Sequence, residues 1–168
     1  MSGRLSIIHS KGSLDWAYPT FILASTAAAM DQEVELFFTM YGLECVRHHT
    51  EHLRVSPLSN PAMPVRFPIG PAGFQKVDWR PWLPNLVLSL PGMERLATWG
   101  FKRTLQQQGQ LPFDELRALC LELGVRFTVC QMSVDLMGLT EKDFIEGVQF
   151  AGAASYLAAS PQQQALFV

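Results

Sequence analysis

Residues 124–138 read GVRFTVCQMSVDLMG, and this stretch carries the strongest indication of a fold in the chain. Its first part, VRFTVC at 125–130, is rich in β-branched and aromatic residues, which predicts a buried strand. The residues that follow, 131–137, predict a short helical turn that ends at Gly138. Cys130 therefore lies where a strand passes directly into a helix, an arrangement typical of α/β folds.

Strand and helix signals alternate in the same way over the rest of the sequence. Strands are expected over residues 5–9, 34–40, 86–90, 125–130 and 148–150, and helices over residues 15–30, 42–55, 93–108, 112–123, 131–137 and 152–159. Repeated strand–helix units of this length predict an α/β fold of three layers, with helices on both faces of a mostly parallel sheet. In such sheets functional residues collect at the carboxyl ends of the strands.

Residues 56–84 interrupt this alternation. The segment contains seven prolines, which exclude a long helix and weaken any central strand. It also contains four large aromatic residues, Phe67, Phe74, Trp79 and Trp82. Because 168 residues suit one compact domain, the segment is interpreted as an excursion from a single domain of residues 1–168. It is either a loop folded onto the body or a surface for a partner.

The composition excludes several classes of function. With 48% hydrophobic residues, 17% charged residues and a net charge of −2, the chain has no broad basic surface for nucleic acid. The N-terminal apolar run is too short for a secretory signal, and three cysteines do not make a disulfide framework, so a cytoplasmic protein with reduced thiols is expected. Neither GxGxxG nor GxxxxGK[ST] occurs, and no cofactor is expected.

The thiol of Cys130 is the first candidate for chemistry. At the strand end it is expected to be reachable and to face the unpaired amides of Gln131, Met132 and Ser133. Those amides and the helix dipole favour the thiolate, which is the nucleophilic form. Alternation along the strand places Cys130 with Thr128 on the less apolar face. A buried, inert cysteine is the alternative, because free cysteines are among the most buried residues.

Cys120 is the second candidate thiol. It shares the apolar face of the helix expected over residues 112–123, which favours a core position. It could still resolve a modified Cys130 if the end of its helix packs near that residue.

A further group combines one cysteine with three histidines: Cys45, His48, His49 and His52. These side chains would share one face if residues 42–55 are helical. Thiol and imidazole at this spacing could bind zinc or copper. One helix face presents at most two or three ligands at bonding range, so a solvated histidine-rich face is the favoured interpretation and no metal site is expected.

The segment 124–138 resembles the thiol-bearing segment of the DsrE/DsrF/DsrH-like family, above all its branch labelled peroxiredoxin-like, in which the cysteine is followed by Q-M-S and then M-G. Other matching pieces are Phe37-Phe38-Thr39 with Gly42, Leu90-Pro91-Gly92-Met93, and Glu146-Gly147-Val148 through Gly152. Together they span most of the chain in the expected order. The resemblance implies a flavodoxin-like, DsrE/DsrF-like fold, a homo-oligomer and a role in sulfur transfer.

Members of that family accept sulfur on cysteine as a persulfide or thiosulfonate and exchange it with TusA-type carriers or rhodaneses, as enzymes or as stoichiometric carriers. The resemblance implies that Cys130 is the acceptor, with the amides of Gln131, Met132 and Ser133 holding the added charge. Cys120 is the nearest match to the second cysteine of some relatives. Relatives with a more apolar middle segment are membrane-associated, which leaves peripheral membrane contact as an open alternative here.

Two other functions would use the same features. A thiol peroxidase would need a peroxide-activating Thr or Arg beside the sulfur, and no T-x-x-C pattern surrounds Cys130. A non-catalytic, oligomeric interaction module would use the Pro/Trp/Phe stretch 56–101 as its interface, with Cys130 as a core thiol. Sulfur relay on Cys130 is the favoured interpretation.

Overall fold

The computed structural model describes residues 3–56, 58, 60, 64–66, 69–159 and 164–168. The chain forms two compact units. The first combines Met1–Leu53 with Phe113–Val168, and the second is Arg54–Pro112. The second unit therefore contains the proline-rich segment 56–84 and continues beyond it.

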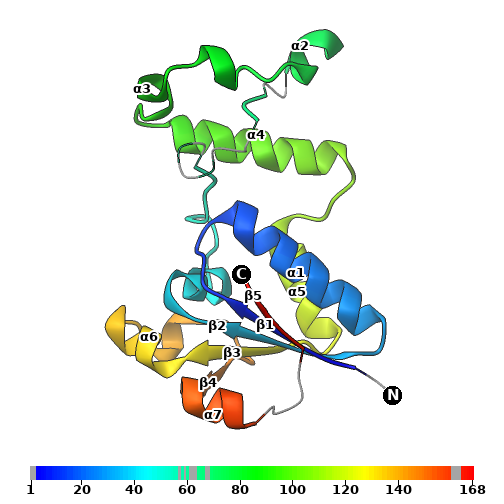
Figure 1. The fold of residues 1–168 in the computed structure, drawn as a ribbon, viewed down its shortest axis with the longest axis vertical. Helices are drawn as coiled ribbons and strands as arrows, with labels where there is room; N and C mark the ends of the chain where they lie inside the picture. Colours follow the sequence, from blue (N-terminus) through cyan, green and yellow to red (C-terminus); the bar gives the residue numbers. More distant parts are fainter. Residues whose placement is uncertain (1–2, 57, 59, 61–63, 67–68, 160–163) are drawn as a thin grey trace. The chain divides into compact units, whose positions relative to one another are not determined.

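The first unit is built on a parallel sheet of five strands (Figure 1). The strands are β1 (Arg4–His9), β2 (Glu33–Phe38), β3 (Arg126–Cys130), β4 (Gln149–Ala151) and β5 (Gln164–Phe167), in the order β4-β3-β2-β1-β5. Every neighbouring pair is parallel. The α/β fold predicted from the alternating strand and helix signals is confirmed, although β5 was not expected.

Helices cover both faces of this sheet. The helices of the first unit, with η for a 3₁₀ helix, are α1 (Leu14–Ala29), η1 (Met40–Val46), α5 (Phe113–Glu122), α6 (Gln131–Leu136), η3 (Glu141–Asp143) and α7 (Ala153–Ala158). α1 and α5 pack side by side on one face, and α7 lies on the other (Figure 1). The unit thus has three layers.

Alternation along the strands divides the core between the two faces. Buried side chains of one parity face α1 and α5: Ile7, Leu36, Phe38, Phe127 and Val129. Phe21 of α1 lies at the centre of this layer, with its ring centroid 5.9 Å from that of Phe38 and 5.7 Å from that of Phe127. Side chains of the other parity, Phe37 and Cys130 among them, face α7.

The second unit is helical. It contains α2 (Ala72–Lys76), η2 (Arg80–Trp82), α3 (Asn85–Leu88) and α4 (Met93–Gln107). Thr98 of α4 holds the start of the unit, because its Oγ1 accepts a 2.9 Å hydrogen bond from the Val55 amide. The strand expected over residues 86–90 is wrong: the run forms α3 behind Pro84, and a short apolar run does not distinguish strand from helix. No helix among the described residues is long and apolar enough to cross a membrane.

Candidate functional site

Cys130 is the last residue of β3 and the N-cap residue of α6. Because β3 lies between β2 and β4, the cysteine is at the carboxyl edge of an inner strand. Its Cα is paired with that of Ala151 in β4. The structure therefore places this thiol at the strand-to-helix junction predicted from the sequence.

The Cys130 side chain is covered by other side chains. The residue is 2% exposed and packs with Phe37 and Tyr156, and Ile8 lies against the same cluster. The rings of Phe37 and Tyr156 are stacked, with centroids 4.1 Å apart and planes inclined at 22°. The expectation of a directly reachable thiol is therefore wrong for this conformation, because α7 places an aromatic ring over the strand end.

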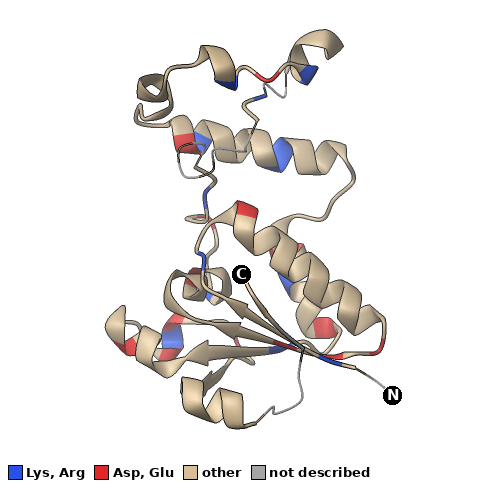
Figure 2. Cartoon of the chain, in the orientation of Figure 1, with Lys and Arg blue, Asp and Glu red and all other residues tan. Residues whose placement is uncertain are grey.

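α7 covers Cys130 with a single side chain. Tyr156 is the one buried residue of this helix, and its hydroxyl is buried without a hydrogen-bond partner in the part of the chain that the structure describes. Burial, and to a smaller extent the charge of Glu35, raises the pKa of Tyr156 to about 12. The helix carries no charged residue (Figure 2). One stacked, neutral ring is thus the main attachment of α7 to the sheet.

A carboxylate on the same face was not singled out from the sequence. Glu35 is a buried residue of β2, and it lies two residues before Phe37 and therefore on its face. It accepts a 2.9 Å hydrogen bond from Thr128 Oγ1, and Thr128 precedes Cys130 by two residues in β3. The alternation of apolar and polar residues along residues 33–38 was the available signal. The face beneath α7 therefore contains an acid and a hydroxyl as well as the thiol.

The prediction assigned a sulfur anion to the backbone amides of Gln131, Met132 and Ser133, and the side chains of the first two are turned to solvent. Gln131 is exposed, and its Nε2 donates a 2.9 Å hydrogen bond to Asp135 Oδ1. Met132 is also exposed. The Cys130 thiol forms no capping hydrogen bond with α6. The role of the α6 amides toward an added sulfur anion therefore stays a prediction.

The side chain of Ser133 joins α6 to the turn after β2 by hydrogen bonds. It is fully buried, and its Oγ accepts a 3.0 Å hydrogen bond from the Met40 amide and lies 3.1 Å from Thr39 Oγ1. Met40 has a positive φ of 48° at this turn, so the hydrogen bond supports a backbone conformation that is uncommon outside glycine. Ser133 thus fixes α6, and with it the strand end at Cys130, to the turn that follows β2.

Cys120 lies on the other side of the sheet. It is fully buried in α5, and its Sγ is 3.4 Å from the backbone oxygen of Phe21 in α1. Burial raises the pKa of Cys120 to about 12, although hydrogen bonds with Ser25 oppose this shift. The structure does not bring this protonated core thiol to Cys130, so a resolving role for Cys120 is not supported.

Cys45 belongs to a buried chain of polar groups that the sequence did not indicate. Its Sγ lies 3.5 Å from His9 Nε2, and His9 Nδ1 lies 3.1 Å from Thr20 Oγ1. Because the Thr20 hydroxyl donates to the Trp16 carbonyl at 3.1 Å, we assign a proton to His9 Nδ1. The Cys45 thiol has two acceptors within reach, His9 Nε2 and the Lys11 carbonyl, which is 3.8 Å from Sγ. Burial lowers the pKa of His9 to about 4, against the opposing Lys11 carbonyl.

Both members of this pair are neutral at physiological pH. Burial, with the charge of Glu44 as a smaller cause, raises the pKa of Cys45 well above its ordinary value. A neutral thiol and a neutral imidazole, both fully buried, join the end of β1 to η1. This arrangement holds the fold together and offers no nucleophile to solvent.

The helix expected over residues 42–55 is wrong. η1 ends at Val46, and its backbone continues in an extended conformation at Arg47. Arg117 of α5 explains the ending, because its Nη1 donates hydrogen bonds to the carbonyl oxygens of Cys45 at 3.1 Å and Arg47 at 2.7 Å. These oxygens are the acceptors that the next turn of a helix would need.

The histidines that follow are therefore not aligned with Cys45. His52 Nε2 pairs with Glu44 Oε2 at 2.6 Å, and His48 and His49 are exposed. No group of three metal-ligating side chains occurs among the described residues. The metal-binding alternative loses the shared helix face on which it depended.

The first unit is a three-layer α/β fold with a cysteine at the carboxyl end of an inner parallel strand, which defines a class of thiol-bearing flavodoxin-like proteins. The chain belongs to the DsrE/DsrF/DrsH-like family, whose model matches residues 2–167. It is 47% identical over 153 residues to the Sulfur carrier protein DsrE2 of Allochromatium vinosum, a match that covers 91% of this chain and 89% of that protein.

Two other similarities agree with this assignment. The uncharacterized protein YrkE of Bacillus subtilis is 28% identical over 156 residues, which cover 92% of this chain and 89% of that protein. The crystal structure of the YchN protein from E. coli matches with a TM-score of 0.53 over 100% of both chains at 9% identity. That likeness concerns the fold alone.

Proposed function

We propose that this chain is a sulfur carrier that accepts and passes on sulfur at Cys130. The observation that supports this most is the position of Cys130 at the junction of β3 and α6, in a chain 47% identical to a protein named a sulfur carrier. Burial raises the pKa of both other thiols, Cys45 and Cys120, so neither supplies a thiolate in the folded chain.

The proposed step exchanges one sulfur–sulfur bond for another. The Cys130 thiolate attacks the outer sulfur of a donor persulfide, R–S–SH. A bond forms between Cys130 Sγ and that sulfur as the bond to the donor breaks, which gives Cys130–S–SH and R–S⁻. The proton lost from Cys130 passes to the departing thiolate or to solvent. The transferred sulfur keeps its oxidation state, so no external oxidant or reductant takes part.

Access to Cys130 requires displacement of α7. The six-residue helix is attached mainly by the ring of Tyr156, whose hydroxyl lacks a hydrogen-bond partner among the described residues. Segments with few buried contacts open at low free-energy cost, well below that of global unfolding. We propose that α7 protects the persulfide from stray oxidants when it lies on the sheet and admits a partner thiol when it leaves.

The partner is proposed to be a TusA-type carrier or a rhodanese, either of which presents sulfur on a cysteine of its own. We also propose that the protein forms a homo-oligomer and is located in the cytoplasm, where thiols stay reduced. The exchange is reversible, so the same step loads and unloads Cys130.

Incubation of the reduced protein with inorganic polysulfide tests the proposal. Intact-mass spectrometry of the wild type is expected to show added sulfur that disappears in Cys130→Ser and Cys130→Ala. Cys120→Ala is the matched control, because it removes a thiol from the opposite face and is expected to take up sulfur like the wild type. Equal uptake by Cys130→Ser and the wild type would refute the assignment.

The burial of Cys130 favours one alternative, a non-catalytic interaction module in which this residue is a core thiol. The two proposals differ in the reactivity of the native thiol. A carrier is expected to be alkylated at Cys130 in the native state, slowly but at a measurable rate, through opening of α7. A core thiol reacts only when the whole protein unfolds, so its alkylation would follow the global unfolding rate.

A further inference from the structure

The second unit contains a large apolar cavity of its own. The cavity has a volume of about 520 Å³, which is within the range of natural small-molecule sites. Its walls include Leu83 and Val87 from the region of α3, and Met93, Leu96 and Phe101 from α4. The lining residues that the structure describes all belong to Arg54–Pro112, and Cys130 and its neighbours are not among them.

Large apolar side chains border this cavity while remaining in contact with solvent. Leu96 is 47% exposed and Trp99 is 44% exposed. Both lie on α4, and between them the lining includes the small residue Ala97, with Gly100 following. Small residues at these positions leave the cavity open for a guest.

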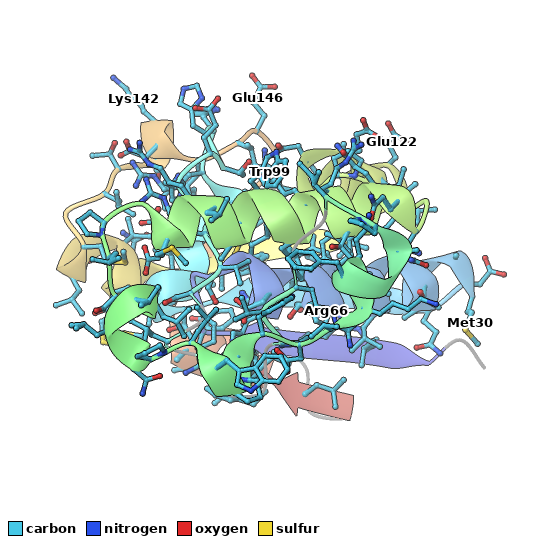
Figure 3. All side chains as sticks on the ribbon, turned by 90° about the horizontal axis from the view of Figure 1, so that it is seen from above. Met30, Arg66, Trp99, Glu122, Lys142 and Glu146 are labelled. Atoms are coloured by element: carbon cyan, nitrogen blue, oxygen red, sulfur yellow. The ribbon has the colours of Figure 1, made fainter. Side chains whose placement is uncertain are left out.

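The lining has few polar side chains, and only one of those described is charged. Arg66 and Thr104 contribute to it, and none of the described lining residues is acidic. Arg66 is exposed and forms no ion pair with any residue that the structure describes. Trp99 on α4 and Arg66 on the segment before α2 can both be found in Figure 3. The cavity thus combines apolar walls with one unpaired guanidinium.

The backbone beside Arg66 is fixed. The Val65 amide donates a 2.9 Å hydrogen bond to Asp78 Oδ1, and the Val65 carbonyl accepts a 3.0 Å hydrogen bond from the Trp79 amide. These bonds tie the segment to the start of η2. The guanidinium is therefore carried by an anchored piece of chain at the cavity, and a guanidinium pairs with a carboxylate through two parallel hydrogen bonds.

We propose that this cavity binds a single-chain amphiphile with a carboxylate head, a long-chain fatty acid in chemical terms. The hydrocarbon tail fills the apolar space along α4, and the carboxylate pairs with Arg66. A ligand that is polar along its length would leave its groups unsatisfied against these walls. A purely apolar ligand would leave the Arg66 guanidinium in water and gain nothing from its charge. The proposal is independent of sulfur transfer at Cys130.

Isothermal titration of the full-length chain with saturated carboxylates of increasing length tests this proposal. Each ligand is used as a monomer, below its critical micelle concentration. We expect one site per chain, with affinity that rises by about fourfold for each added methylene until the tail fills the cavity and then stops rising. Affinity that is independent of chain length, or no saturable binding, would overturn the proposal.

Two variants test the binding of the hydrocarbon tail and of the carboxylate head separately. Ala97→Phe fills the cavity and is expected to abolish binding of the longest ligands. Arg66→Gln, at an exposed position, is expected to weaken carboxylate binding by about tenfold and to leave binding of the primary alcohol of equal length unchanged. Lys102→Gln is the matched control, since it removes a charge from α4 outside the lining.

Circular dichroism checks that each variant is folded. If Ala97→Phe does not fold, the result with Arg66→Gln decides the proposal. Equal carboxylate affinity in Arg66→Gln and the wild type would contradict the head-group assignment. A vesicle arm distinguishes a membrane surface from a free amphiphile: binding to phosphatidylglycerol vesicles without saturable binding of the monomeric carboxylate would also overturn the proposal.

Discussion

At the scale of single residues, the thiol of Cys130 meets two opposed requirements. A carried sulfur has to be shielded from oxidants, and it has to meet the thiol of a partner protein. The 2% exposure of Cys130 satisfies the first requirement, and the weak attachment of Tyr156 offers a route to the second. The energetic role of Tyr156 is therefore open to direct measurement.

Two substitutions at Tyr156 are expected to have opposite effects. Tyr156→Phe keeps the stacked ring and removes a buried hydroxyl without a partner, so the free energy of unfolding is expected to stay equal or rise by up to about 1 kcal/mol. Tyr156→Ala removes the ring, and we expect a loss of about 3 kcal/mol and alkylation of Cys130 at least about tenfold faster. Urea denaturation and timed alkylation measure both. Unchanged alkylation in Tyr156→Ala would exclude α7 as the cover.

His9 is expected to make stability depend on pH. Its folded pKa of about 4 lies below the ordinary value of 6.5, so between these values the unfolded chain binds a proton that the folded chain does not. The contribution of His9 to the free energy of unfolding is complete above pH 6.5. It falls by about 3 kcal/mol as the pH drops to 4. The difference in unfolding free energy between the wild type and His9→Gln should therefore narrow over this range. If the unfolding free energies of His9→Gln and the wild type instead fall in parallel as the pH drops, this prediction is wrong.

At the scale of elements, the close approach of β1 and η1 depends on Gly42. A Cβ at this position would overlap the carbonyl oxygen of His9 in the backbone of β1. Gly42→Ala is therefore expected to destabilise the protein by about 2–4 kcal/mol. Gly73→Ala in α2 is the control, because no atom of the described residues lies within 4 Å of its added Cβ. Thermal unfolding of the two variants compares them, and equal melting temperatures would show that η1 adjusts freely.

Local sequence signals correctly predicted those elements whose conformation is not altered by contacts with distant parts of the chain. The strand over 125–130 and the helix over 112–123 were found within two residues of their expected ends, because β-branched residues and helix-terminating residues specify them locally. The helix over 42–55 failed because the Arg117 side chain, distant in sequence, takes up its carbonyl oxygens. β5 went unrecognised, since its place beside β1 is fixed by tertiary pairing.

The candidate site was likewise predictable only where local sequence specifies it. The position of Cys130 at a strand end followed from the pattern VRFTVC and the helical turn behind it. Its cover by Tyr156 did not, because α7 comes from a distant part of the sequence and periodicity does not show which side chains meet across layers. The pairing of Cys45 with His9 escaped notice for the same reason, as 36 residues separate them.

At the scale of the whole molecule, the two units are joined at neighbouring points of the first unit. Thr50 Oγ1 donates a 2.5 Å hydrogen bond to Asp114 Oδ1, so the chain leaves the first unit and returns to it close to the same place. Domains inserted in this way are often removable, because the host fold does not depend on them.

A chain in which residues 54–112 are replaced by a short Gly/Ser linker is therefore expected to fold. Circular dichroism and cooperative thermal unfolding should show a retained α/β unit. The shortened chain should still take up sulfur from polysulfide and should lose all binding of long-chain carboxylates. Loss of cooperative unfolding would mean that the sheet needs the second unit, and retained carboxylate binding would place that site elsewhere.

The central claim, that Cys130 carries the sulfur, is tested most directly by peptide mapping after polysulfide treatment without reductant. Cleavage after Lys and Arg places the three cysteines on separate peptides, residues 12–47, 118–126 and 127–142, so each thiol reports independently. We predict a mass increase of one sulfur atom on peptide 127–142 and none on the other two. An unmodified 127–142 peptide, with sulfur on Cys45, on Cys120 or on no cysteine, would contradict the account.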